Sequence, residues 1–86
     1  MAAGEELADL LDEARALVER AKEGVKSDRS PITLVEKIQI NDTVKLVQKL
    51  MIVLIKDINR GRNTDKNEEK LKRAVEALKT SIDNIL

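Results

Sequence analysis

The chain has 86 residues, and its 16 Lys and Arg are balanced by 16 Asp and Glu, so the formal net charge is zero. It contains no His, no Cys and no aromatic residue, which excludes imidazole-activated nucleophiles, disulfides and thiolate or imidazole zinc sites. The length allows one small domain, which we place over residues 1–86. Because Gly and Pro are scarce while Leu, Ala, Glu and Lys are frequent, we expect an all-α chain.

A first helix is predicted over about residues 5–23. Its apolar residues recur at steps of three and four, which is typical of one buried helix face. These residues are Leu7, Leu10, Leu11, Ala14, Leu17, Val18 and Ala21. Gly24 is expected to end this helix, because Gly readily adopts the left-handed conformation found after a helix. Ser30 and Pro31 then predict the start of a second helix, as N-cap and first-turn residue.

The segment after Pro31 is predicted to form two helices, at about 31–39 and 43–60. The second carries one regular apolar seam: Ile40, Val44, Val47, Met51, Leu54 and Ile58. On one straight helix, Leu34, Val35 and Ile38 would point to the side opposite this seam. We therefore expect a bend near residues 40–43, with Asn41 and Asp42 capping the new helix.

A β-strand is the alternative for residues 32–40, because Ile32, Leu34, Ile38 and Ile40 alternate with other residues. Such a strand needs a partner, as in a DNA-binding dimer of the ribbon-helix-helix type, where one strand precedes two helices. The acidic first helix and the zero net charge do not fit that class.

The last helix is predicted over about residues 65–86, after a stop at Gly61. Asp65 and Glu68 resemble a capping box with Asp65 as the cap. The apolar seam consists of Leu71, Val75, Leu78, Ile82 and Ile85, and the exposed face offers the pairs Glu68–Lys72 and Glu69–Arg73. The expected fold is a small antiparallel bundle of three long helices, with the short helix 31–39 covering one side or end.

Six consecutive apolar residues, Leu50 to Ile55, cover the whole circumference of a helix. Ile52 is the clearest outlier, because its neighbours on the helix surface are polar. One interpretation is a central helix that the short helix covers on its outer side. The other is an exposed apolar strip that binds a protein partner or a second copy of the chain, centred on Ile52 and Ile55 and flanked by Lys45 and Lys56.

Charge is segregated along the chain. Residues 1–24 hold 7 acidic and 3 basic groups, whereas residues 25–63 hold 4 acidic and 8 basic groups. Pairing of the acidic first helix with the basic segment is the simpler interpretation. Nucleic-acid binding is the other, through a basic end formed by Lys56, Arg60, Arg62, Lys66, Lys70 and Arg73. The neutral balance and the lack of aromatic stacking groups argue against it.

The sequence contains no recognisable motif for a catalytic, metal-binding or phosphate-binding site. Asp9 and Glu13 lie on a solvated acidic face, and no serine has a general base of the usual type. No EF-hand loop or Gly-rich phosphate loop occurs. We therefore expect no enzyme activity, cofactor, metal or small-molecule substrate. With no signal sequence or membrane-spanning segment evident, we expect a soluble cytoplasmic protein.

The chain resembles de novo designed or engineered helical bundles. The resemblance is one of style and covers the whole chain: an aliphatic core, stops at Gly24 and Gly61, the Ser30-Pro31 start and balanced charges. It departs from that style at "IQINDT" and "LMIVLI", where β-branched residues and Asn lower helix propensity. The leading hypothesis is a non-enzymatic helical scaffold or protein-interaction module. The alternatives are a ribbon-helix-helix-like DNA-binding dimer and a small four-helix receptor ligand.

Overall fold

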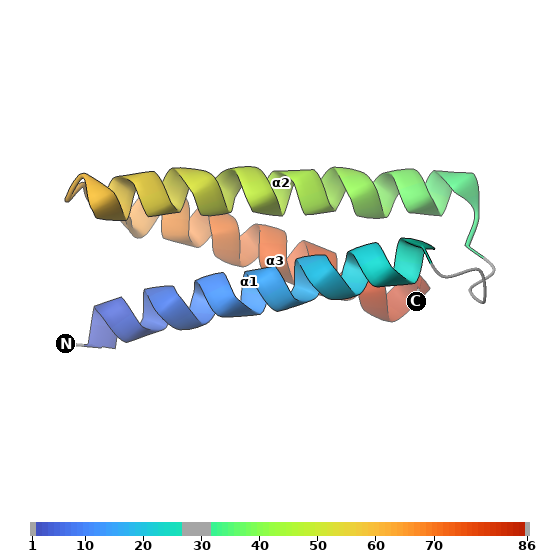
Figure 1. Cartoon of the computed structure of the whole chain (residues 1–86), viewed down its shortest axis with the longest axis horizontal. Coiled ribbons are helices and arrows are strands. Elements are labelled where there is room, and N and C mark those ends of the chain that lie inside the picture. Colours follow the sequence, from blue (N-terminus) through green and yellow to red (C-terminus); the bar gives the residue numbers. More distant parts are fainter. Residues whose placement is uncertain (1, 27–31, 86) are drawn as a thin grey trace.

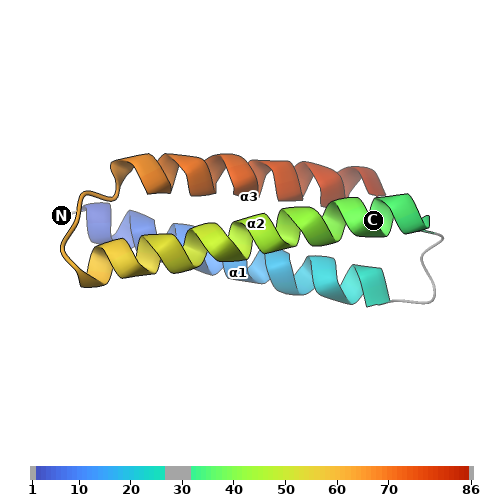
Figure 2. The same ribbon diagram turned by 90° about the horizontal axis from the view of Figure 1, so that it is seen from above.

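The computed structural model describes residues 2–26 and 32–85, with side chains from residue 6 onward. It contains three helices, α1 (Ala2–Lys26), α2 (Leu34–Asn59) and α3 (Asp65–Ile85). Helix α2 runs antiparallel to the other two, and all three lie side by side in a bundle of 44 × 19 × 16 Å (Figure 1, Figure 2). The predicted all-α bundle is confirmed. The described residues form three helices and not four, and they contain no strand, so the strand alternative for residues 32–40 is wrong.

The core is built entirely from aliphatic side chains, and each helix contributes one stripe. The buried residues are Leu10, Ala14, Val18 and Ala21 from α1, Ile40, Val44, Val47 and Leu54 from α2, and Leu71, Ala74, Val75, Leu78 and Ile82 from α3. No polar or charged residue is buried within the described part of the chain. The predicted seams are largely confirmed, but Ile58, near the end of α2, is 41% exposed. None of the helices described is both long and apolar enough to cross a bilayer.

Helix α2 is continuous through the predicted bend, so the separate helices at 31–39 and 43–60 are wrong. Asn41 and Asp42 cap nothing and lie at exposed positions inside the helix, where each costs only about 0.7 kcal/mol relative to Ala. A break there would lose several backbone hydrogen bonds and require a second nucleation step. The Thr43 hydroxyl donates to the Gln39 carbonyl oxygen at 2.9 Å, so it finds a partner without interrupting the helix.

Thr33 caps the start of α2. The Glu36 backbone N–H donates to Thr33 Oγ1 at 3.2 Å, and the Thr33 N–H donates to Glu36 Oε1 at 3.0 Å. This capping box places the helix start after the predicted Ser30-Pro31 start, and those two residues lie outside the described part of the chain. Because α2 then runs straight, Leu34, Val35 and Ile38 are left 73%, 64% and 51% exposed.

The other helix ends match the predictions in part. Helix α1 runs through Gly24 to Lys26, so the predicted stop is wrong; a Gly inside a helix costs only about 1 kcal/mol. Asp65 is not the cap of α3, because it already lies in the first turn and its own N–H donates to Asn63 Oδ1 at 2.9 Å. The extent of α3 is otherwise close to the predicted one.

Gly61 ends α2 as predicted. Its φ is +68°. The Gly61 N–H donates to the Ile58 carbonyl oxygen at 3.1 Å, and the Arg62 N–H donates to the Asp57 carbonyl oxygen at 2.9 Å. These two hydrogen bonds satisfy carbonyl groups of the last turn and redirect the chain toward α3.

Gly61→Ala is expected to lower the free energy of unfolding by about 1 kcal/mol, measured by urea denaturation. A Cβ at this position would meet no heavy atom within 4 Å, so the cost is conformational and not steric. Gly61→Asn is the matched control and should lower the free energy of unfolding by less than Gly61→Ala does, because Asn tolerates positive φ better than Ala. An Ala variant as stable as the parent chain would contradict the explanation.

Candidate functional site

Helix α2 carries every exposed large apolar side chain in the described residues. Their exposed fractions run from 38% for Ile55 to 73% for Leu34. The set is Leu34, Val35, Ile38, Leu46, Ile52, Ile55 and Ile58. Since α1 and α3 bury their apolar stripes and present polar residues to water, α2 is the helix whose apolar surface exceeds what the bundle covers.

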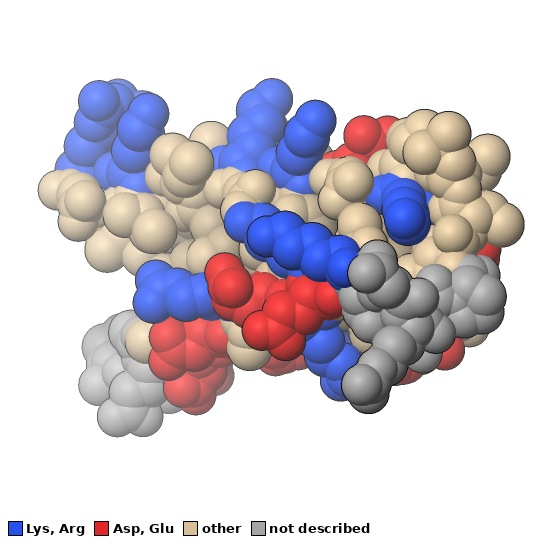
Figure 3. All heavy atoms as spheres, turned by 45° about the vertical axis from the view of Figure 1, so that its right-hand side comes forward, with Lys and Arg blue, Asp and Glu red and all other residues tan. Residues whose placement is uncertain are grey.

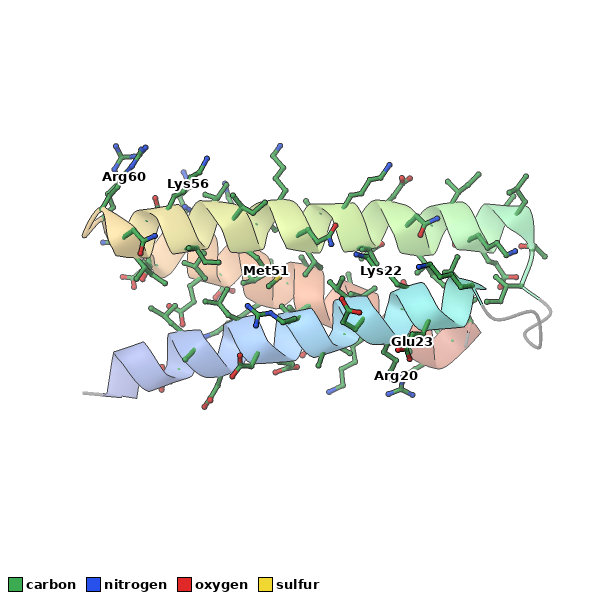
Figure 4. The ribbon with its side chains drawn as sticks, viewed as in Figure 1. Arg20, Lys22, Glu23, Met51, Lys56 and Arg60 are labelled. Atoms are coloured by element: carbon green, nitrogen blue, oxygen red, sulfur yellow. The ribbon has the colours of Figure 1, made fainter. Side chains whose placement is uncertain are left out.

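The predicted binding residues Ile52 and Ile55 lie together on this surface. With Gln48 and Met51 they line a shallow hollow of about 420 Å³. Figure 4 shows Met51 on the side of α2 that faces the rest of the bundle. The short helix expected to cover Ile52 does not exist in the described residues, and Ile52 is 55% exposed. The interpretation of a fully covered central helix is therefore wrong for the part of the chain that the structure describes.

Lys45 and Lys56 are exposed on the same side of α2 as Ile52. With Lys49, these residues follow one another at steps of four, three and four, so they form one line along the outer side of the helix. We call this line of Lys45, Lys49, Ile52 and Lys56 the α2 crest. Lys56 points away from the bundle, as does Arg60 beyond it (Figure 4).

A second apolar hollow, between α2 and α3, was not predicted. It measures about 440 Å³ and is lined by Leu46, Leu50, Ala74 and Ala77, with Lys70 and Arg73 beside them. Leu46 and Leu50 are one turn apart and lie beside the inner seam of α2, which we define as its buried residues Ile40, Val44, Val47 and Leu54. The sequence therefore already indicates an apolar patch beside this seam. Their approach to the alanines of α3 depends on the packing of the bundle.

A third hollow lies between α1 and α3, and we call it the α1–α3 groove. It measures about 510 Å³ and contains the carboxylates of Glu6, Asp9 and Glu13 from α1 and Glu76 from α3, together with Leu10, Val75 and Lys72. Leu10 and Val75 are buried, whereas the four carboxylate residues are exposed. Lys72 Nζ lies 3.6 Å from Glu68 Oε1, so its charge has a partner on its own helix. The predicted solvated face at Asp9 and Glu13 is thus one wall of an acidic groove.

Charges of opposite sign lie on different parts of the surface. In Figure 3, Lys and Arg stand along much of the upper edge, over α2, and Asp and Glu form a cluster below, over α1, with further Lys and Arg side chains beside it. Both ion pairs among the described residues, Glu68–Lys72 and Glu69–Arg73, are within α3 and were predicted. Helices α1 and α2 lie side by side, as expected, but the described residues show no ion pair between them.

The residues of the predicted basic end are all exposed. Lys56 and Arg60 lie at the end of α2, Arg62 in the turn, and Lys66, Lys70 and Arg73 on α3. Arg73 Nε is 3.6 Å from Glu69 Oε1, which offsets part of the positive charge. Lys66, Lys70 and Arg73 follow steps of four and three along α3, whereas the other three lie at the end of α2 and in the turn, so no one helix carries the whole set.

The carboxylates of the described residues form no group of three or more that could hold a metal ion. No protein-family model matches the chain, and no curated protein or solved structure is significantly similar to it. The uncovered surface of α2 is therefore the feature from which function is inferred.

Ile52→Lys is expected to leave the bundle folded, with a change in the free energy of unfolding below about 1 kcal/mol. The side chain is already half in water, so the new ammonium group stays solvated. Leu54→Lys, two residues away at a position with 0% exposure, should unfold the chain by burying an unpaired charge. Far-UV circular dichroism and thermal unfolding compare the two variants. Loss of helical signal in Ile52→Lys would show that Ile52 belongs to the core.

Proposed function

We propose that the chain is a non-enzymatic helical interaction module, which binds a partner helix through the α2 crest and the apolar side chains beside it. The observation that carries this proposal is that, among the described residues, every exposed large apolar side chain lies on α2. Removing apolar surface from water contributes roughly 25 cal/mol per Å² before the costs of association. A helix laid along α2 would cover Ile52 and its neighbours, as in other complexes in which a helix binds an apolar surface.

The charges beside Ile52 define the chemistry of the partner. Lys45, Lys49 and Lys56 are exposed on the crest, so a partner gains most when acidic residues flank its apolar stripe. Such charges act mainly on association rate and specificity, while the apolar contact supplies most of the affinity. The expected partner is an amphipathic helix with aliphatic residues on one face and Asp or Glu beside them.

The alternative functions have less support. A ribbon-helix-helix dimer needs a strand, and residues 32–85 contain only helices and connections. A four-helix receptor ligand needs a fourth helix, and the described residues form three. A designed origin and a cytoplasmic location stay predictions from the sequence.

Two synthetic peptides test the proposal. Both are helical, about 20 residues long, with Leu at every a and d position of the heptad; one has Glu and the other Lys at the flanking positions. Fluorescence anisotropy measures their binding. We expect the Glu peptide to bind about tenfold or more tightly than the Lys peptide, and Ile52→Lys to weaken binding of the Glu peptide by a similar factor.

The matched control is Ala16→Lys, which adds the same charge at an exposed position of α1. It should leave binding of the Glu peptide within about twofold, because it does not touch the crest. Equal binding of the two peptides, or unchanged binding by Ile52→Lys, would overturn the proposal.

A further inference from the structure

We propose that the α1–α3 groove receives the α2 crest of a second copy of this chain, so that copies associate head to tail. This inference rests on the proposed function, because it names the partner that covers Ile52. It joins two features that face different directions on one molecule: a line of exposed cations around an isoleucine, and a groove walled by carboxylates.

The shapes of the two surfaces are complementary. In a bundle of three helices, the groove between any two of them lies on the side away from the third, so the α1–α3 groove faces away from α2. The crest projects from the molecule, whereas the groove is a hollow of about 510 Å³. Leu10 and Val75 form its buried apolar floor, and the aliphatic parts of the acidic side chains and of Lys72 supply most of the apolar surface that Ile52 of another copy contacts.

The charges on the two surfaces are opposite in sign and match in spacing. Four carboxylates line the groove against one cation, Lys72, which already has Glu68 as a neighbour. Along α1 the acids Glu6, Asp9 and Glu13 follow steps of three and four. Along the crest, Lys49, Ile52 and Lys56 follow the same steps, so both sets span about 10 Å. The two lysines can therefore meet carboxylates on the groove wall while Ile52 lies between them.

Neither the crest lysines nor the groove carboxylates form an ion pair within the described residues. The ion pairs found there are both within α3, and neither includes a crest lysine or the groove carboxylates of α1. Since the formal net charge of the chain is zero, no overall repulsion keeps the copies apart. Two crests facing each other would place lysines against lysines, which disfavours a symmetric contact between α2 helices.

A contact between two different surfaces has a structural consequence. Each bound copy still presents one free crest and one free groove, so association continues beyond a dimer unless the rotation between copies closes a ring. Blocking the groove on one variant and the crest on another leaves each variant with one functional surface. A mixture of the two should then stop at a dimer.

The test uses the full-length chain and two half-blocked variants. Asp9→Lys/Glu13→Lys blocks the groove, and Ile52→Lys blocks the crest; all three positions are exposed, and circular dichroism checks that both variants fold. Light scattering follows the molar mass from about 10 μM to about 1 mM. The molar mass of the parent chain should rise past that of a dimer as the concentration increases. Each variant alone should associate at least about tenfold more weakly than the parent chain. An equimolar mixture of the two variants should form a dimer.

The outcomes separate this inference from the proposed function. Any of three results overturns the head-to-tail contact. The parent chain stays monomeric, the groove-blocked variant associates as strongly as the parent chain, or the mixture forms no dimer. The groove-blocked variant should still bind the Glu peptide, since its crest is intact. If only the Ile52→Lys variant loses binding of this peptide, the crest is the surface that binds it. Asp9→Asn/Glu13→Gln removes the charges with little change in volume and should also weaken association, with the effect shrinking at high salt.

Discussion

Burial of the inner seam of α2 between α1 and α3 is the interaction on which the structure depends. Ile40, Val47 and Leu54 have no exposed surface, and they face aliphatic stripes of both neighbouring helices. No polar or charged group among the described residues is buried with them. Hydrophobic burial has no directionality, so the match of side-chain shapes sets the register of the three helices.

This arrangement leaves α2 with more apolar surface than the bundle can cover. Two neighbours enclose one side of a helix, and the apolar residues of α2 extend around to the other sides. Ile52 and Leu46 lie on different sides of the covered seam, which gives two separate hollows beside the helix. Basic side chains gather over α2 and acidic side chains over α1, so unlike charges lie on different parts of the surface although the net charge of the molecule is zero.

The errors of the sequence-based prediction have a common cause. Asn41, Asp42 and Gly24 are local signals for helix ends, yet each lies inside a helix. An unfavourable residue costs at most about 1 kcal/mol, whereas ending a helix also costs the packing of everything beyond that point. Gly61 ended its helix as predicted, because its positive φ and the two turn hydrogen bonds lead directly into α3.

The sequence by itself determined the helical class, the aliphatic stripe of each helix and the unusual position of Ile52, because these follow from composition and the period of 3.6 residues. Only the tertiary structure decided that α2 continues through residue 42, that no described helix covers Ile52, and that Glu76 of α3 joins the acids of α1 in one groove. The physical reason is that local periodicity defines the faces of a helix, whereas packing between distant segments decides which of those faces meet water.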